Sequence, residues 1–236
     1  AVCCLFFLVL SFFYLFFALV LPFKMALLKE VESIALACLR ESSSSAAIKQ
    51  ISDACEKLTS SDFCSSRVPL SPESHFLTRK YPMMYTIHES NLMTMALFVL
   101  PKGSILPLHD HPRMNVLTKF LYGDLSIVAF DKGNALDDGI FEANQKVNFR
   151  WNEKENWSVH HTSPDDGNIH EIFAHSHSAF FDILTPPYNE THQITYYNLL
   201  RSENKKFSLQ LLDEPPQWFV CGGETFFEPT KNNNKA

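Results

Sequence analysis

Short apolar runs, some alternating and some continuous, occupy the chain from about residue 81 onward. Gly, Pro, Asn and Asp separate eight of them, which read MYTIHES, MTMALFVLP, NVLTKFLYG, LSIVAFD, QKVNFRW, IHEIFAH, SAFFDILTPP and ITYYNLL. Runs of this length bounded by turn residues are typical of β-strands. Because no helical period lies between them, the pattern predicts an all-β sandwich or barrel.

Two stretches before this region have the spacing of amphipathic helices. From Met25 to Cys38 apolar residues recur at helical intervals, and a serine-rich stretch follows. Residues 46–58 repeat the pattern, with apolar positions from Ile48 to Leu58 on one face and a preceding serine available as N-cap. We therefore expect a helical hairpin that packs on the β domain.

The first 23 residues carry no charge and are long enough to cross a bilayer as a helix. They begin with Ala, lack a positively charged start and show no clear small-x-small cleavage site, so they do not fit a signal peptide well. Two interpretations stay open, an over-extended gene model whose true start is Met25, and a membrane anchor or truncated signal segment. The expected division is a hydrophobic segment (1–24), a helical region (25–66), a β domain (67–228) and a disordered polar tail (229–236).

Charge and cysteine content limit the classes of partner and the cellular compartments that we expect. Lys and Arg total 20 against 26 acidic residues, giving a net charge of −6, and no basic run could follow a phosphate backbone, so we expect no nucleic-acid partner. None of the six cysteines forms a CxxC pair, and none lies between Cys64 and Cys221. This usage indicates reduced thiols and a cytoplasmic location, with membrane anchoring as the alternative if residues 1–23 are real.

The candidate chemistry is concentrated in PKGSILPLHDHPRMNVLTKFLYGD, where His109 and His111 lie one residue apart. On a strand, residues i and i+2 point to the same face, so we expect the two imidazoles to project together. The spacing from Gly103 through both histidines to Gly123 resembles the first cupin motif, except that Val116 stands where that motif has glutamate. The resemblance implies that His109 and His111 bind a metal.

The segment PDDGNIHEIFA resembles the second cupin motif and supplies His170 as the third ligand. The match is partial, because Ala174 replaces the consensus asparagine and the leading glycine is missing. Three neutral imidazoles would leave the full charge of a divalent ion, which favours an anionic ligand such as a thiolate. The implied fold is a cupin double-stranded β-helix, a jelly-roll barrel, with N-terminal helices.

The remaining histidines are weaker candidates. His175 and His177 form a second HxH pair, but they fall in a predicted loop without flanking glycines. The others are expected to be surface or hydrogen-bonded structural residues, namely His88, His160, His161 and His192.

Taken together, LPLHDHPRM, KFLYGDLSIVAFD, GNIHEIFA and FFDILTPPY resemble the thiol dioxygenases that comprise 2-aminoethanethiol (cysteamine) dioxygenases and plant cysteine oxidases. The resemblance runs from about Met84 to Leu200. It implies Fe(2+), insertion of both atoms of O2 into a thiol to give a sulfinic acid, and a monomer. It also implies that the thiol belongs to cysteamine or to the N-terminal cysteine of a protein, the latter in oxygen sensing.

Two further residues are assigned to the site through the same resemblance. Asp182 matches a position associated with the active-site cavity, where a carboxylate would suit a substrate ammonium group, and Tyr188 closes the same motif. The alternatives are that Asp182 caps a turn or pairs with a lysine, and that Tyr188 packs at the barrel rim. Arg113 departs from the family, which usually has glycine there, and could alter access to the metal.

No cysteine lies in the predicted barrel, so we expect no thioether crosslink to Tyr196 or Tyr197. Two other functions remain as alternatives. One is a cupin metalloenzyme of different chemistry, such as an isomerase or a ring-cleaving dioxygenase, and the other is a non-enzymatic cupin binding protein.

Overall fold

The computed structural model describes residues 25–63, 80–152, 159–201 and 206–227. The hydrophobic segment 1–24 and the whole tail 229–236, on which predictions were made above, lie outside the described residues. None of the helices in the described part of the chain is both long and apolar enough to span a membrane.

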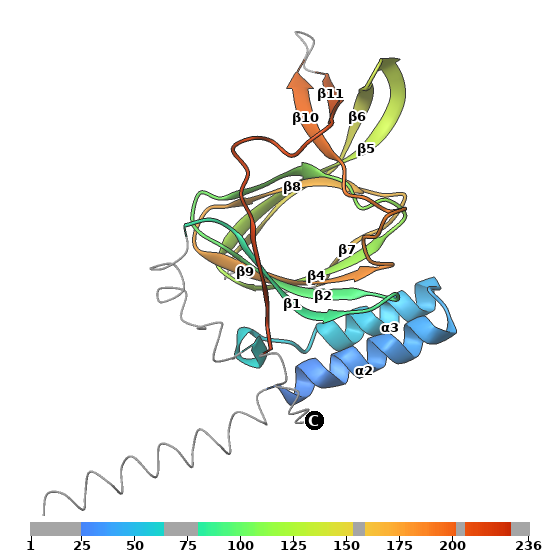
Figure 1. The fold of residues 1–236 in the computed structure, drawn as a ribbon, viewed down its shortest axis with the longest axis vertical. Coiled ribbons are helices and arrows are strands. Elements are labelled where there is room, and N and C mark those ends of the chain that lie inside the picture. The colour runs from blue at the N-terminus through green and yellow to red at the C-terminus, as the bar shows by residue number, and fades with distance from the viewer. Residues whose placement is uncertain (1–24, 64–79, 153–158, 202–205, 228–236) are drawn as a thin grey trace, which may run out of the picture.

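In the described residues, twelve strands follow two helices and one 3-10 turn (Figure 1). The helical elements are α2 (Ala26–Glu41), α3 (Ser45–Cys55) and η1 (Ser60–Phe63). The strands are β1 (Met83–Glu89), β2 (Thr94–Leu100), β3 (Ile105–His109), β4 (Asn115–Tyr122), β5 (Asp124–Asp137), β6 (Ile140–Asn152), β7 (Val159–Thr162), β8 (Ile169–Ala174), β9 (Ser178–Thr185), β10 (Tyr196–Arg201), β11 (Phe207–Leu212) and β12 (Gly222–Thr225).

The strands form two hydrogen-bonded sets. Sheet A has the order β12-β1-β2-β9-β4-β7, and sheet B has the order β10-β11-β6-β5-β8-β3, which closes because β10 also pairs with β3. The two sets face each other around a barrel interior, seen end-on in Figure 1. The predicted all-β barrel with N-terminal helices is therefore confirmed.

The helical hairpin covers the outer face of sheet A (Figure 1). Leu28 and Val31 of α2 and Ile51 of α3 are buried in one cluster with side chains from β1, β2 and β9. The predicted serine cap is Ser44, whose hydroxyl accepts a hydrogen bond from the amide of Ala47 at 3.4 Å. The periodicity thus predicted both helices and the faces that they bury.

A buried lysine joins the hairpin to the barrel. Lys119, on β4, donates a hydrogen bond to the backbone carbonyl of Glu56 at 3.0 Å, just beyond the end of α3. The Glu56 carboxylate in turn accepts from the amide of Val159, on β7, at 2.7 Å. These bonds give the buried ammonium group of Lys119 a partner and connect the C-terminal end of α3 to the barrel.

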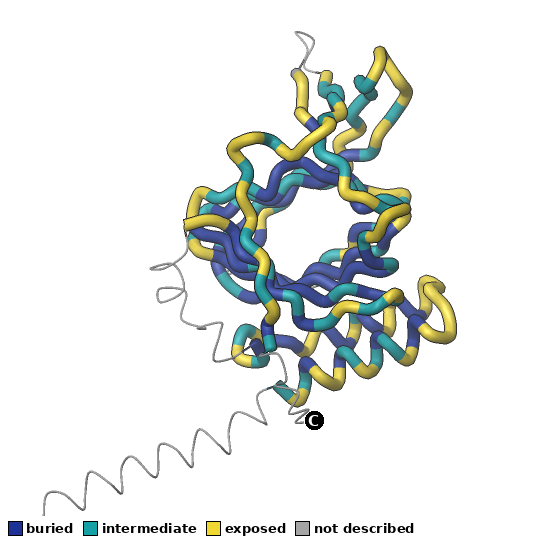
Figure 2. Tube along the Cα trace, in the orientation of Figure 1, coloured by how far each residue is buried: buried dark blue, intermediate teal, exposed yellow. Residues whose placement is uncertain are grey.

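The outer ends of β5, β6, β10 and β11 extend beyond the barrel as an arm (Figure 1). Figure 2 shows the contrast in burial, because the barrel walls are largely buried whereas the arm is mostly exposed or intermediate. The interior of the barrel is filled at one end by apolar side chains that include Phe120, Trp151 and Phe180. This packing leaves the other part of the interior open for a site.

The apolar runs did not predict four of the strands, β3, β7, β11 and β12. Strand β3 contains Pro107, and β7 has the largely polar sequence VHHT, so neither resembles an independent strand. Strand β12 begins with two glycines and forms only by pairing with β1. All four are therefore defined by their partners more than by their own sequence.

Candidate metal centre

Three histidine side chains converge inside the barrel from β3, the turn after it, and β8. The ring centroids of His109, His111 and His170 are 4.8 to 4.9 Å apart in all three pairs. Their possible ligand atoms lie within 4.8 Å of one another, and the residues are 9%, 3% and 4% exposed, respectively. The structure thus brings together the three residues that the motif spacing predicts.

His109 and His111 do not share a strand, contrary to the prediction. His109 is the last residue of β3, but His111 lies beyond the strand, in a turn closed by the bond from the Met114 amide to the His111 carbonyl at 3.0 Å. The two rings therefore do not project together by strand alternation. The turn brings His111 back toward His170, and the register of β3 with β8 places His109 directly opposite His170.

An asparagine that the sequence did not single out holds this turn in place. The side-chain oxygen of Asn168 accepts from the His111 amide at 3.0 Å, and its amide nitrogen donates to the His111 carbonyl at 2.8 Å. Asn168 follows Gly167 and precedes β8, so it belongs to the same motif as His170. The signal was the asparagine within GNIH, but its partner lies 57 residues away in the chain.

Hydrogen bonds define which nitrogens of the rings are available. Nδ1 of His109 lies 2.7 Å from the carbonyl oxygen of Pro107, which can only accept, so Nδ1 carries the proton. The hydroxyl of Tyr188 lies 2.7 Å from the carbonyl of Asp110 and 2.7 Å from Nδ1 of His111. If it donates to the carbonyl, it accepts from Nδ1 of His111. Both rings then present an unprotonated Nε2 to the site.

The charge state also suits a metal. Burial lowers the pKa of His109 to about 4 and holds the pKa values of His111 and His170 well below the ordinary range of histidine. All three rings are neutral near pH 7, which is the form that binds metals. The Nε2 atoms of His111 and His170 are 3.1 Å apart, a separation open to two nitrogens each about 2 Å from one ion.

Val116, which stands where the cupin motif has glutamate, is buried in an apolar cluster with Met114 and Leu184. It is absent from the residues that line the cavity around the histidines. The local donor set is therefore three imidazoles with no carboxylate from this position.

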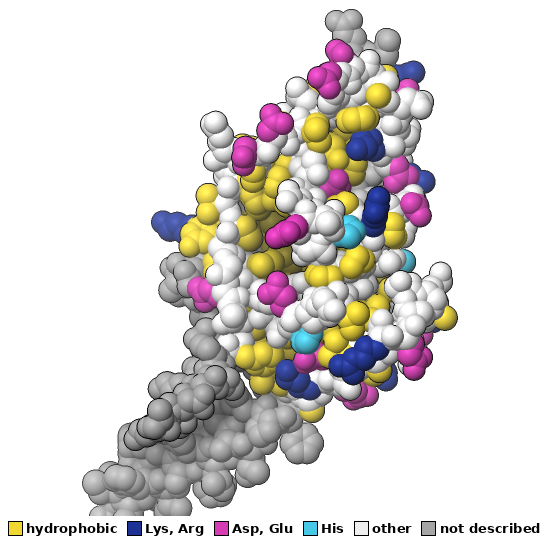
Figure 3. Space-filling view, turned by 45° about the vertical axis from the view of Figure 1, so that its right-hand side comes forward, with side chains coloured by type: hydrophobic (Ala, Val, Ile, Leu, Met, Phe, Trp, Pro, Cys, Tyr) yellow, Lys and Arg dark blue, Asp and Glu magenta, His cyan; other side chains and the backbone are white. Residues whose placement is uncertain are grey.

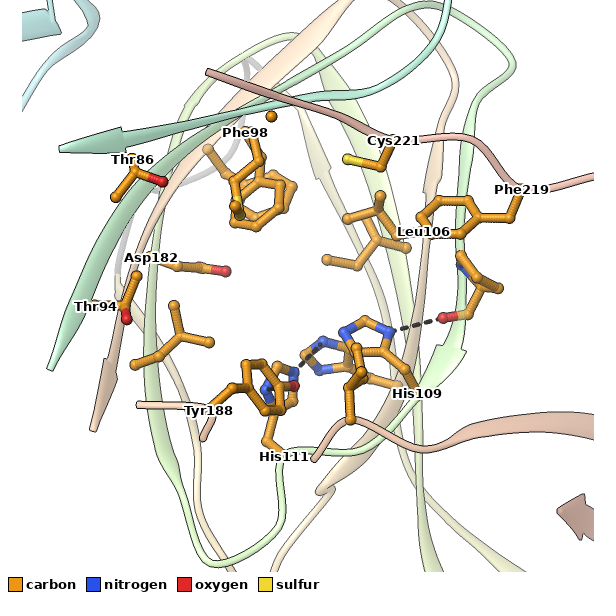
Figure 4. Close-up of a pocket in the computed structure, with 18 of the residues that line it drawn as sticks. Thr86, Thr94, Phe98, Leu106, His109, His111, Asp182, Tyr188, Phe219 and Cys221 are labelled. Atoms are coloured by element: carbon orange, nitrogen blue, oxygen red, sulfur yellow. Dashed lines mark hydrogen bonds between the residues drawn. The ribbon is translucent and has the colours of Figure 1, made fainter. Parts of the chain in front are cut away.

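Asp182 lines the same cavity from β9, on the opposite side from the histidines (Figure 4). It is 7% exposed, and its Oδ1 has no hydrogen-bond partner among the described residues. Burial raises the pKa of this carboxyl to about 7, whereas a hydrogen bond from Thr118 acts to lower it. Asp182 thus lines the cavity, as predicted; it lies within β9 and not at a turn, and no lysine among the described residues pairs with it.

The cavity has a volume of about 460 Å³ and is lined mainly by apolar side chains, including Phe98 and Phe180. Figure 3 shows it as a hollow with hydrophobic side chains inside. Among the described residues that line it are two carboxylates, Glu89 and Asp182, and no lysine or arginine. Arg113 is exposed and does not line the cavity, so the expected effect on access finds no support.

The backbone at Arg113 has a conformation that glycine adopts more readily than arginine. Its φ of 59° lies in the left-handed region, where glycine is favoured and an arginine is strained.

Cysteine does reach the site, contrary to the sequence-based expectation. Cys221 and Tyr196 both line the cavity, and the thiol of Cys221 points into it (Figure 4). Cys221 belongs to the segment between β11 and β12, which crosses the barrel mouth (Figure 1). The chain separation between this segment and the barrel motifs concealed the contact. The cysteines whose structure is described, Cys38, Cys55 and Cys221, are free thiols.

The other histidines are not members of the three-histidine cluster. His175 and His177 follow β8 in a loop, as predicted, and each has a hydrogen-bonding neighbour, Ser126 and the Lys102 amide. His161 contacts the Asn115 side chain at 2.9 Å. His160 packs against Phe149 and Trp151, His88 pairs with Glu32 at 2.9 Å, and His192 lies in a turn with Asn189.

The three neutral, buried histidines inside this β-barrel form a group that could hold a metal ion. The family model PCO_ADO matches residues 54–228 of this chain. The chain therefore belongs to the PCO_ADO family.

Relatives in three organisms support this assignment. The chain is 35% identical over 122 residues to a probable 2-aminoethanethiol dioxygenase of Dictyostelium discoideum, covering 48% of this chain and 54% of that protein. It is 31% identical over 122 residues to plant cysteine oxidase 1 of Arabidopsis thaliana, covering 49% and 41%. Identity to the 2-aminoethanethiol dioxygenase of Homo sapiens is 28% over 183 residues, covering 63% and 68%. The chain thus spans about half the length of the first two.

Solved structures with similar backbones include a double-stranded β-helix protein from Klebsiella pneumoniae and an RmlC-like cupin protein from Desulfovibrio desulfuricans. The first is 13% identical with a TM-score of 0.37, covering 56% of this chain and 97% of that chain. The second is 18% identical with a TM-score of 0.32, covering 46% and 86%. At these TM-scores, the strand pairing of this chain is what defines its fold.

Proposed function

We propose that the chain is a non-haem iron thiol dioxygenase acting on an aminothiol head, either cysteamine or the N-terminal cysteine of a protein. The reaction converts R–SH and O2 into R–SO2H, so both oxygen atoms join the sulfur and no further reductant is needed. Membership of the PCO_ADO family supports this chemistry. The observation that carries the proposal is the buried triangle of His109, His111 and His170 facing a carboxylate across one cavity.

The three imidazoles are proposed to hold Fe(2+) through Nε2. Their neutral state and the proton on Nδ1 of His109 fit a divalent ion. The 3.1 Å between Nε2 of His111 and Nε2 of His170 fits one as well. Bound iron would supply the ability to bring a thiol sulfur and O2 together on one ion. The Tyr188 hydroxyl, between Asp110 and His111, keeps the His111 ring oriented for this role.

Asp182 is proposed to bind the ammonium group of the substrate. Its Oδ1 is buried without a partner among the described residues, and such an atom is stabilised by a charged donor. A substrate ammonium would also compensate for the burial that raises the pKa of this carboxyl. The sulfur and the amino group of an aminothiol would then contact opposite walls of one cavity.

The lining argues for a substrate without a negative charge beside the amino group. Among the described residues around the cavity none is lysine or arginine, so a carboxylate there would be buried without a cation. Cysteamine has no carboxylate, and in an N-terminal cysteine the carboxylate is replaced by a neutral amide. Neither proposed substrate therefore has a carboxylate beside its amino group that would need a cation in the cavity.

The test is to load the purified protein with Fe(2+) and offer cysteamine, or a peptide that begins with cysteine, under air. The expected result is a mass increase of two oxygen atoms on at least one thiol, and its loss in the His170→Ala variant. A matched variant, His175→Ala, removes a loop histidine outside the cluster and should retain the reaction. An iron-loaded protein that oxidises neither thiol to a sulfinic acid would contradict the proposal.

A further inference from the structure

The segment between β11 and β12, residues 213–221, forms a strap across the barrel mouth (Figure 1). At its end Phe219 and Cys221 line the cavity, and the chain continues directly into β12. Strand β12 pairs in parallel with β1, with Gly222 opposite Met83 and Gly223 opposite Met84. The strap and β12 therefore form one wall of the cavity.

The two adjacent glycines of β12 have different structural requirements. A Cβ on Gly222 would lie 2.3 Å from Sδ of Met83, a buried core residue, and 2.9 Å from the ring of Tyr81. Packing thus requires glycine at position 222. A Cβ on Gly223 would meet nothing within 4 Å, and the φ of Gly223 is outside the left-handed region. Neither packing nor backbone conformation requires glycine at position 223.

The space beside Gly223 belongs to the cavity. Gly223 lines it, and its neighbours across the strands are Met84 of β1 and then Phe98 of β2, which line it as well. Register partners on adjacent strands share a face, so these three residues form one row of the wall. A side chain at position 223 would therefore project into the cavity beside Met84.

This row lies next to the one that contains Asp182. Thr86, two residues after Met84, pairs with Ala96, and Ala96 pairs with Asp182. Two residues along a strand correspond to about 7 Å, so the open space at Gly223 begins one row away from the carboxyl. When the proposed substrate has its sulfur at the histidines and its ammonium at Asp182, the rest of the molecule must leave the site along a wall with free space.

We propose that Gly223 is a specificity-determining residue, because its missing side chain leaves a lane for the part of the substrate beyond the aminothiol head. The inference rests on the proposed function and deepens it. The lane lies among Met84, Phe98 and Phe219, so it suits a neutral or apolar extension, such as the second residue of a peptide. Cysteamine has no extension and does not use the lane.

The experiment measures kcat/KM of the iron-loaded full chain for cysteamine and for a cysteine-glycine-glycine amide, in a series from Gly223→Ala through Gly223→Val to Gly223→Leu. The ratio of the peptide value to the cysteamine value should fall with each step. It should be at least about tenfold lower in Gly223→Leu, since pockets discriminate by about 10- to 200-fold per misplaced methylene. Thermal unfolding midpoints identify any variant that fails to fold. Gly223→Ala should fold even if the larger substitutions do not, because its Cβ would meet nothing within 4 Å.

The matched control enlarges a side chain of the strap that does not line the cavity. Val220 is 56% exposed and lies outside the cavity, so Val220→Leu should leave the ratio unchanged. If every Gly223 variant folds and the ratio of the peptide value to the cysteamine value does not change, the proposed role of Gly223 is wrong. It is also wrong if the wild-type protein oxidises cysteamine but not the peptide. If the wild type oxidises neither thiol, the proposed function itself fails, and this outcome is distinct from the other two.

Discussion

Strand β9 turns one face toward the helices and the other toward the cavity, and both faces are buried. Phe181 and Ile183 contact the apolar cluster under the hairpin, whereas Phe180 and Asp182 line the cavity. The helix-facing side chains are apolar and are packed against other apolar side chains. The cavity face includes a carboxyl with an oxygen that has no partner among the described residues. Burial alone therefore does not distinguish the stabilising face of β9 from the cavity face, and the unsatisfied oxygen of Asp182 is what sets the cavity face apart.

The largest effect is expected on the helix-facing side. Phe181 is fully buried, and its ring lies 5.1 Å from that of Phe63, so Phe181→Ala should lower the free energy of unfolding by about 3–5 kcal/mol. Urea unfolding measures this change, and Phe181→Leu should lose much less. The molecules that remain folded should keep their activity. A large loss of activity at full stability would mean that the two faces are not independent.

The neighbouring residue should behave in the opposite way. Asp182→Asn removes a charged partner for the substrate ammonium, worth about 1.5–3 kcal/mol, so kcat/KM should fall by about 10- to 150-fold while the iron content stays near normal. Steady-state kinetics and metal analysis measure the two effects. Asp138→Asn, an exposed change on the β5–β6 turn, is the matched control. Loss of iron in Asp182→Asn would show that the residue acts on the metal.

The same variant should change the pH dependence of stability. Burial raises the pKa of Asp182 from 3.8 to about 7, so the unfolded state releases this proton at lower pH than the folded state does. Folding stability attributable to this group therefore falls as the pH rises from about 4 to above 7. Asp182→Asn should lack this decline, a difference on the order of 2–4 kcal/mol. Urea unfolding at pH 5 and pH 8 tests it, and parallel curves for both proteins would contradict it.

A smaller effect is expected from the residue that orients a histidine. Tyr188→Phe removes the hydroxyl between the Asp110 carbonyl and His111, and such losses cost about 10- to 100-fold in metal affinity or activity. Iron titration and kcat measure the outcome. Tyr81→Phe, at a 37% exposed tyrosine, should change neither quantity. Unaltered iron affinity and activity in Tyr188→Phe would leave the tyrosine with a packing role alone.

The smallest effect concerns the link between the hairpin and the barrel. Lys119→Met keeps the length of the side chain but leaves the Glu56 carbonyl without this donor, at a cost of about 1–2 kcal/mol in stability. The exposed pair of Lys49 and Asp53 offers the comparison, because Lys49→Met should cost about 0.5 kcal/mol or less. Equal effects of the two substitutions would show that the buried bond adds little.

The sequence predicted those parts of the fold that have their own periodicity. Both helices and eight strands followed from apolar spacing, whereas β12 and β3 depend on pairing partners far along the chain. The three histidines were predicted from motif spacing, although His111 reaches its position through a turn and not along a strand. Motif spacing thus identified the three histidines but not the backbone conformation that brings them together.

The contacts that position the site could not be predicted. Asn168 holds the backbone of His111 across 57 residues, and the Tyr188 hydroxyl reaches it across 77. Cys221 reaches the cavity only because the strap crosses the barrel mouth. None of these contacts leaves a local pattern, since each depends on the closure of the whole barrel.

The central claim is that this chain places both atoms of one O2 molecule on a thiol. The direct measurement is the mass of the product formed from cysteamine, or from a peptide that begins with cysteine, by the Fe(2+)-loaded protein under oxygen-18 gas. A sulfinic acid that carries two heavy oxygen atoms is the predicted result. A disulfide, or a product in which one or both oxygens come from water, would contradict the claim.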